Sequence, residues 1–305
     1  MNMDEQYKQF LKSAREFIPK DRIYTDDLHC LAWGTDAGFY RHLPKIVVRS
    51  KDEDEVARLL RLADKLELPV TFRAAGTSLS GQAVTDSILI VAGKNWERYE
   101  VSADAQMITL QPGIIGERVN EILKPYGRIF SPDPASKKSA MVGGIVMNNA
   151  SGMNCGTHAN SDRILQSVRI VMADGTILDT GDRRSCDNFR RTHPDFIKKI
   201  EELRDRLNAD KELVARIKHK YAIKNVTGLN IYPFVVYTDP FKIITHLMVG
   251  SEGTLGFGSE FKMATGHLHK HSASAMLYFS DMRTACEAVV AMKNGPVYSA
   301  EMLDK

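Results

Sequence analysis

Apolar residues near the start of the chain follow a strand pattern, then a helix pattern, then a strand pattern again. Residues 46–48 and 69–72 are short runs rich in β-branched and aromatic side chains, which predict strands. Between these runs, apolar side chains recur at helical spacing and form one stripe: Val56, Leu59, Leu60, Ala63 and Leu66. Ser50 and Glu53 stand at the spacing of a capping box, so we expect the helix to begin there. The pattern predicts a β-α-β unit.

The same two patterns continue through the middle of the chain. Residues 87–91 and 107–110 are short apolar runs that predict buried strands. Apolar positions between residues 119 and 123 mark a helix that should stop near Pro125, because proline lacks an N–H donor and clashes with the preceding turn. Residues 168–178 are two apolar runs around Asp174-Gly175, which predicts a β-hairpin.

The second half of the chain begins with a charged section. Residues 183–225 space their apolar side chains helically among many charges, and we expect them to leave the sheet as helices with a solvated face. From Ile243 the sequence is strand-like again, and a strand at 274–279 and a helix at 282–292 follow. Strands and helices in this order predict an α+β fold.

A turn of small residues directly follows the strand at 69–72. Residues 73–82 read Arg-Ala-Ala-Gly-Thr-Ser-Leu-Ser-Gly-Gln. Small side chains let a backbone come close to a ligand, and successive N–H groups in such a turn form a nest that binds anions. The hydroxyl groups of Thr77 and Ser78 and the charge of Arg73 would add to this nest. The composition suits a pyrophosphate, although an ordinary tight loop between two strands has similar residues.

Two later stretches repeat this composition. Residues 141–152 are rich in glycine and asparagine, and residues 249–258 contain Gly-Ser-Glu-Gly-Thr-Leu-Gly. Each stretch adjoins an apolar run, and the rigid segment Pro132-Asp133-Pro134 lies close to the first of them. Three such stretches indicate backbone that lines one long ligand at several points.

Composition and charge restrict the class of protein. The chain has 305 residues, of which 43% are hydrophobic and 26% charged, values near the average for a globular protein. A net charge of +3 is too small to argue for nucleic acid as a partner. No apolar run approaches a membrane span of about 20 residues, so no transmembrane segment is expected, and the polar start of the chain lacks a signal-peptide core. The cysteines are scattered without a CxxC pair, which favours reduced thiols in the cytoplasm.

Other motifs that carry chemistry are absent or weak. His267, His269 and His271 would share one face of a strand, but a structural zinc site usually has four ligands, so we expect no metal. The chain has neither GxGxxG after a strand nor GxxxxGK(S/T), which argues against Rossmann and P-loop nucleotide sites. Cys155 is either a reactive thiol or a small buried side chain, and His158 either touches the ligand or lies in a surface loop.

Taken together, these motifs resemble the FAD-binding domain of the vanillyl-alcohol oxidase/PCMH flavoprotein family. The resemblance is greatest to its D-lactate dehydrogenase/glycolate oxidase group, and within it to large bacterial members that continue into a C-terminal iron–sulfur domain. It runs from about residue 44 to residue 261 through residues 73–82, Ser131-Pro132-Asp133-Pro134, residues 143–152, residues 171–175 and residues 250–256. One residue departs from the family pattern, since Ala74 stands where the family turn usually has glycine.

The resemblance implies FAD as the cofactor and a set of residues that bind it. Backbone from Ala75 to Ser78 would hold the pyrophosphate, with Arg73 close by, and Ile170 would present backbone to the adenine or the ribose. The residues expected to bind FAD are Arg73, Ala75, Gly76, Thr77, Ser78, Gln82, Pro132, Asp133, Gly143, Gly144, Asn148, Asn149, Ser151, Gly152, His158, Ile170, Glu252 and Gly256. We expect non-covalent FAD, because Thr77 occupies the position from which a histidine tethers the flavin in some members of the fold.

The resemblance also implies a domain arrangement and an activity. Residues 1–43 would be an N-terminal segment, residues 44–265 a PCMH-type FAD-binding domain of two α+β subdomains, and residues 266–305 the truncated beginning of a substrate, or cap, domain. The activity would be oxidation of a D-2-hydroxy acid, such as D-lactate, glycolate or D-2-hydroxyglutarate. No catalytic base is identified, because in this family it lies mostly in the cap domain and beyond, and we expect this part alone to be inactive.

Several points stay open at this stage. The electron acceptor would be a quinone, a cytochrome or a partner protein, and a cytoplasmic protein of this kind could also associate peripherally with the inner membrane. An iron–sulfur cluster would belong only to a C-terminal part outside this chain. Other activities of the same fold are those of a sugar or alcohol oxidase or of an NADPH-dependent reductase. A flavin-binding component that only relays electrons within a complex is the non-enzymatic alternative.

Overall fold

The computed structural model of the chain describes residues 3–225, 228–292, 295 and 297–303. Its helices are α1 (Met3–Ala14), α2 (Asp27–Trp33), α3 (Glu53–Lys65), α4 (Gly116–Leu123), α5 (Val142–Asn148), α6 (Ser161–Ile164), α7 (Arg183–Thr192), α8 (Pro194–Ala209), α9 (Lys211–Lys220), α10 (Pro233–Val236), α11 (Pro240–Leu247) and α12 (Met282–Met292). Its strands are β1 (Ile23–Tyr24), β2 (Ile46–Arg49), β3 (Val70–Arg73), β4 (Ile88–Val91), β5 (Tyr99–Val101), β6 (Met107–Leu110), β7 (Arg128–Ile129), β8 (Leu165–Val171), β9 (Ile177–Asp179), β10 (Phe257–Ala264) and β11 (Gly266–His267).

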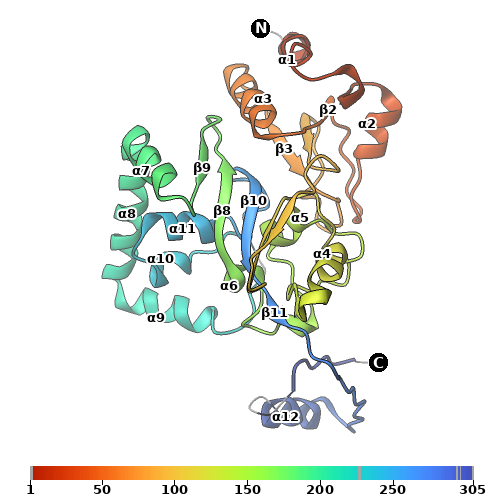
Figure 1. Ribbon diagram of the computed structural model, residues 1–305, viewed down its shortest axis with the longest axis vertical. Coiled ribbons are helices and arrows are strands. Elements are labelled where there is room, and N and C mark those ends of the chain that lie inside the picture. Colours follow the sequence, from red (N-terminus) through yellow and green to blue (C-terminus); the bar gives the residue numbers. More distant parts are fainter. Residues whose placement is uncertain (1–2, 226–227, 293–294, 296, 304–305) are drawn as a thin grey trace.

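Two sheets organise the chain, and helices cover them (Figure 1). The first has the strand order β1-β2-β4-β3, in which β2, β4 and β3 run parallel and β1 is antiparallel to β2. The second is antiparallel, with the order β5-β6-β10-β8-β9, and β7 pairs with β11 separately. The predicted α+β fold is therefore confirmed. The predicted β-α-β unit is present as β2-α3-β3, with β4 inserted between its two strands.

The start of α3 differs from the prediction in its capping residue. Asp52 is the N-cap, and its carboxylate accepts a hydrogen bond from Glu55 N at 3.0 Å. The Glu55 carboxylate in turn accepts from Lys51 N at 2.9 Å. The predicted capping box at Ser50 is wrong, because the Ser50 hydroxyl is buried and donates to Val91 O on β4 instead. The apolar stripe of α3 is buried against the first sheet as its spacing predicts.

The core under the first sheet includes the residues that precede residue 44. Tyr7, Phe10 and Ile18, from α1 and the turn after it, are buried in the same apolar cluster as Leu59 of α3. Strand β1 extends the sheet by pairing with β2. These residues are thus an integral part of the first sheet's layer.

The second sheet packs its inner face against α4, α5 and a group of helices from the charged section. The helical excursion predicted for residues 183–225 is confirmed as α7, α8 and α9, which gather with α10 and α11 beside the second sheet (Figure 1). Phe189 and Ile197 are the buried anchors of α7 and α8. In the described part of the chain no helix is long and apolar enough to cross a membrane.

The strand-like sequence predicted from Ile243 is a helix, α11, so that prediction is wrong. Asp239 caps the helix by accepting from Phe241 N at 3.0 Å, and Pro240 occupies its first turn. Most residues of α11 are buried and only Lys242 is exposed, so a short apolar run does not reveal its period. The chain returns to the sheet only at β10.

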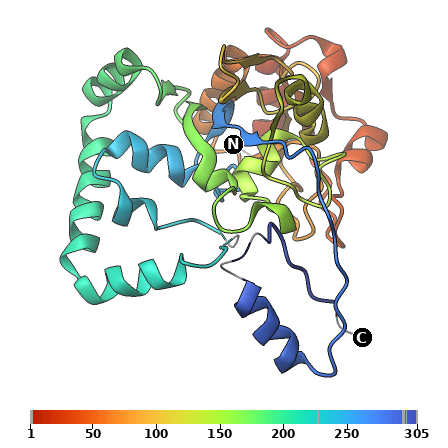
Figure 2. The same ribbon diagram turned by 60° about the horizontal axis from the view of Figure 1, so that its bottom comes forward.

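The C-terminal residues lie apart from the two sheets (Figures 1 and 2). Helix α12 forms as predicted, but none of its residues is buried. The strand predicted for residues 274–279 is absent, because an isolated extended segment has no partner for its backbone hydrogen bonds. Met276, Leu277, Tyr278 and Phe279 of this segment are exposed.

Candidate functional site

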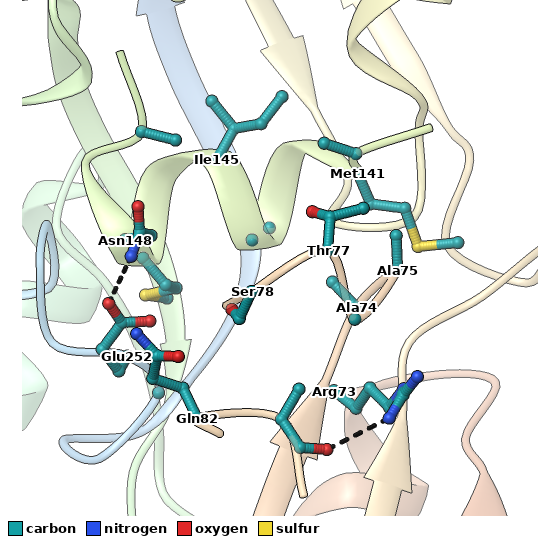
Figure 3. A pocket seen from close by; sticks show the side chains of 18 of the residues that line it. Arg73, Ala74, Ala75, Thr77, Ser78, Gln82, Met141, Ile145, Asn148 and Glu252 are labelled. Carbon is teal, nitrogen blue, oxygen red and sulfur yellow. Dashed lines mark hydrogen bonds between the residues drawn. The ribbon is translucent and has the colours of Figure 1, made fainter. Parts of the chain in front are cut away.

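A cavity of about 640 Å³ lies where the first sheet meets the second. All three small-residue stretches of the sequence contribute to its walls: the turn after β3, the segment of α5 and the turn before β10 (Figure 3). The predicted FAD-binding residues that line it are Arg73, Ala75, Gly76, Thr77, Ser78, Gln82, Gly143, Gly144, Asn148, Ser151, Glu252 and Gly256.

The turn after β3 keeps a conformation that depends on Gly76. Gly76 has φ +72°, and a Cβ atom there would lie 2.3 Å from Nη2 of Arg73, so no larger side chain fits without displacing the guanidinium group. Ala74, the departure from the family pattern, does not have a positive φ and needs no glycine. The loop after α2 braces the turn, since Ala37 N donates to Ser78 O at 3.1 Å.

Arg73 is a buried cation that ties the turn to neighbouring segments. Its Nη1 donates to the carbonyl oxygens of Trp33, Thr35 and Ala83 at 3.2, 2.7 and 3.3 Å, and its Nε is buried without a partner. Burial lowers the pKa of Arg73 from its usual value, and the field of Asp36 opposes that shift. Within the described residues no carboxylate reaches ion-pair distance of Arg73. An anion in the cavity would offset the cost of this buried charge.

Helix α5 forms the wall opposite the turn (Figure 3). Val142, Ile145 and Val146 bury their side chains in the second core, which fixes the helix in place. The helix ends at Asn149, which takes the left-handed conformation with φ 54°. Asn149 is not part of the cavity lining, and its Oδ1 accepts a hydrogen bond from Asp162 N at 3.2 Å. The sequence predicted Asn149 as a ligand contact, whereas in the structure it is the C-cap residue of α5.

Glu252 joins the three walls of the cavity. Its backbone N donates to Met147 O at 2.9 Å, and its carboxylate accepts from Asn148 Nδ2 at 2.5 Å (Figure 3). Gln82 of the first turn points its amide nitrogen toward the same carboxylate (Figure 3). Burial raises the pKa of Glu252, and the two amide hydrogen bonds oppose that shift. Glu252 holds this position at φ 54°, an uncommon conformation for a residue other than glycine.

Other residues predicted to bind FAD lie outside the cavity lining. The Asp133 carboxylate pairs with Lys137 Nζ at 2.6 Å, and Gly152 packs on the backbone of Asp133 so closely that a Cβ would lie 1.6 Å from Asp133 O. Ile170 is fully buried in the second sheet, and His158 is exposed. The residues not brought to the cavity are Pro132, Asp133, Asn149, Gly152, His158 and Ile170.

The cavity also includes residues that the sequence reasoning missed. Lys224 lines it and donates from Nζ to Gly152 O at 2.8 Å, which places a second cation at its edge. Pro112 and Phe257 add apolar surface. No motif surrounds Lys224 in the sequence, and only the packing of distant segments brings it to the site.

Comparison with protein families gives a match to part of the chain. Residues 44–181 match a family described as FAD binding domain. This match agrees with the resemblance to PCMH-type FAD-binding domains that the sequence motifs indicated.

Individual relatives extend the similarity over most of the chain. The D-2-hydroxyglutarate dehydrogenase of Haemophilus influenzae is 25% identical over 79% of this chain, and glycolate oxidase subunit GlcD of Escherichia coli is 28% identical over 56% of it. The chain spans only 26% and 35% of the lengths of these two relatives. Among solved structures, an alkyldihydroxyacetonephosphate synthase superposes with a TM-score of 0.60 over 87% of this chain and 41% of its own, at 18% identity. At that identity the likeness shows the fold alone.

The residues of the cavity fit the FAD that the family implies. Three buried polar atoms at the cavity have no partner among the described residues: Arg73 Nε, Gln82 Oε1 and Ser151 Oγ. They offer a cationic donor, an acceptor and a hydroxyl group, and FAD carries anionic phosphates, ring N–H groups and hydroxyl groups that would match them. The cavity volume also lies within the usual range for sites of small molecules and cofactors.

The contact between Gly152 and Asp133 provides a test of how the cavity wall is built. We expect Gly152→Ala to lower the free energy of unfolding by about 3 kcal/mol, because the new methyl group overlaps the Asp133 carbonyl group. Gly93→Ala is the matched control, since nothing lies within 4 Å of a Cβ there, and it should change stability by less than about 0.5 kcal/mol. Urea unfolding followed by circular dichroism measures both. Equal effects of the two substitutions would contradict the packing.

Proposed function

We propose that this chain is the FAD-binding portion of an FAD-linked oxidoreductase that oxidises a D-2-hydroxy acid. The observation that carries the proposal is the cavity between the sheets, where three small-residue stretches meet beside the buried cation of Arg73. The substrate class comes from the names of the sequence relatives, because D-2-hydroxyglutarate and glycolate are both 2-hydroxy acids. Sequence identities of 25% and 28% support a substrate class but do not identify one particular hydroxy acid.

Each wall of the cavity has a separate task in this proposal. The backbone N–H groups from Ala75 to Ser78 would bind the pyrophosphate, with the Arg73 charge behind them. Helix α5 and Glu252 would shape the opposite wall and exclude water. When bound, FAD supplies a two-electron acceptor, and the protein supplies its position and electrostatic environment.

We infer the same division of domains that the sequence indicated. Residues 44–265 form the FAD-binding domain, with residues 1–43 packed into its first layer. Residues 266–305 belong to the beginning of a substrate domain. The exposed apolar residues of α12 and of residues 276–279 support this assignment, since such side chains are normally buried in a domain core.

The first test concerns FAD binding by the turn after β3. We expect the purified chain to bind FAD in a 1:1 ratio and Gly76→Val to weaken binding about 100-fold or more, because the side chain meets the Arg73 guanidinium group and the positive φ disfavours it. Gly127→Val is the matched control: Gly127 also has a positive φ, of +64°, but has open space around it and lies outside the cavity. Quenching of flavin fluorescence measures both affinities. Equal losses would place FAD elsewhere.

The second test concerns how the flavin is attached. We expect non-covalent binding, because the Thr77 hydroxyl is a poor nucleophile without an activating base. The Cys155 thiol is buried, donates to Gly152 O at 3.2 Å and is not part of the cavity lining. Acid precipitation of the FAD-loaded protein should leave the yellow colour in the supernatant. A fluorescent band on a denaturing gel would contradict this.

The third test concerns the reaction. In the full-length protein that contains this chain, we expect D-lactate, glycolate or D-2-hydroxyglutarate to bleach the flavin absorption band anaerobically, because the substrate's electron pair passes to FAD. Glucose and NADPH are the control substrates, and residues 1–305 alone should show no bleaching. Bleaching by glucose or NADPH but by no hydroxy acid would favour another activity of the fold.

A further inference from the structure

Gln82 is a cavity residue whose two side-chain amide atoms face different surroundings. Its amide nitrogen is turned toward the Glu252 carboxylate and its Oε1 toward the open cavity (Figure 3). That oxygen is buried and has no partner among the described residues. A buried acceptor without a donor is costly, so the position points to a ligand that supplies one.

The orientation of this amide follows from the hydrogen bonds of Glu252. An ionised carboxylate only accepts hydrogen bonds, so Gln82 must present its NH₂ group to it. Asn148 Nδ2 donates to the same carboxylate from α5, and the Glu252 backbone is anchored on Met147 O. Asn148 and Glu252 together therefore fix Gln82 Oε1 as an acceptor that faces the cavity.

Because Gln82 Oε1 is a hydrogen-bond acceptor, it suits some parts of a bound dinucleotide and not others. A phosphate group at neutral pH presents only acceptor oxygens, which repel a carbonyl oxygen. Gln82 Oε1 is therefore unsuited to the pyrophosphate, although Gln82 lies in the same turn as Thr77 and Ser78. FAD has donors suited to it: the hydroxyl groups of the ribityl chain and the ribose, and two N–H donors on its rings, which are the imide N–H of the flavin and the exocyclic amine of the adenine.

We propose that Gln82 is a positioning residue that accepts a hydrogen bond from a ring N–H group of the bound dinucleotide, with Glu252 and Asn148 setting its orientation. This proposal rests on the proposed binding of FAD. It assigns Gln82 a different task from the residues that precede it in the turn: they bind the phosphates, and Gln82 selects a ring. A ring without the donor would leave Oε1 buried and unpaired, which lowers affinity about tenfold or more.

The experiment titrates the chain with FAD and two analogues at pH 8, well above the usual pKa of a carboxyl group, because burial raises the pKa of Glu252. In N3-methyl-FAD the imide donor is blocked, and in flavin hypoxanthine dinucleotide the adenine amine is replaced by an oxygen. We expect one analogue to bind the unaltered protein about tenfold more weakly than FAD. In Gln82→Met, which keeps the length of the side chain and removes the acceptor, that difference should disappear. The analogue that discriminates identifies the ring.

Three results would overturn the proposal. They are equal binding of all three ligands to the unaltered protein, a difference that persists in Gln82→Met, or weaker binding of both analogues by equal factors. Persistence in Gln82→Met would mean that the analogue is excluded by its shape. If the unaltered protein does not bind FAD, the proposed function is refuted and this inference with it. That outcome differs from the three above, because then neither FAD nor its analogues would bind.

Glu252→Gln tests the orienting role separately. An amide at position 252 can donate a hydrogen bond as well as accept one, so it no longer forces the Gln82 amide into one orientation. We expect the variant to keep its fold by circular dichroism and to lose the discrimination between FAD and the analogue. Full discrimination in Glu252→Gln would show that Glu252 does not orient Gln82.

Discussion

The guanidinium group of Arg73 is removed from water at the end of β3, and the arrangement of the cavity depends on it. It binds carbonyl oxygens of Trp33 and Thr35 on one side and of Ala83 on the other. These bonds bring the N-terminal loop and the far end of the turn to one point. They are bonds to neutral groups and do not neutralise the charge. The first sheet thus places a buried positive charge beside the cavity, with Asp36 as the neighbouring carboxylate that acts on it.

The second sheet contributes shape where the first contributes charge. Helix α5 and the turn before β10 come from segments about a hundred residues apart in the sequence, and the Asn148–Glu252 hydrogen bond connects them. Glu252 adopts a left-handed conformation to reach this position. Strained residues of this kind persist where the surrounding structure holds them firmly. The cavity is therefore a property of the interface between two independent cores.

The sequence predicts the elements and the composition of the site better than the side-chain contacts. Strands with β-branched runs and the amphipathic helix α3 follow from their periodicity. Helix α11 resembles a strand in the sequence, because a short helix with most of its residues buried shows no clear period. Gly76 and Gly152 look equivalent in the sequence. The structure separates them, since one lines the cavity and the other packs on Asp133 O. Lys224 has no local signal, because only tertiary packing brings it to the cavity.

The connection between β3 and β4 limits the insertions and deletions that this protein can accept. These strands are parallel neighbours, and a parallel pair needs a connection that travels back along the full strand length, a role that a helix usually fills. Here residues 74–87 make that return without a helix, and the cavity turn is part of them. A deletion in this segment would shorten the only route by which β4 reaches the middle of the sheet. Insertions, which cost little closure entropy, are compatible with the topology, whereas deletions that take the connection well below about a dozen residues are not.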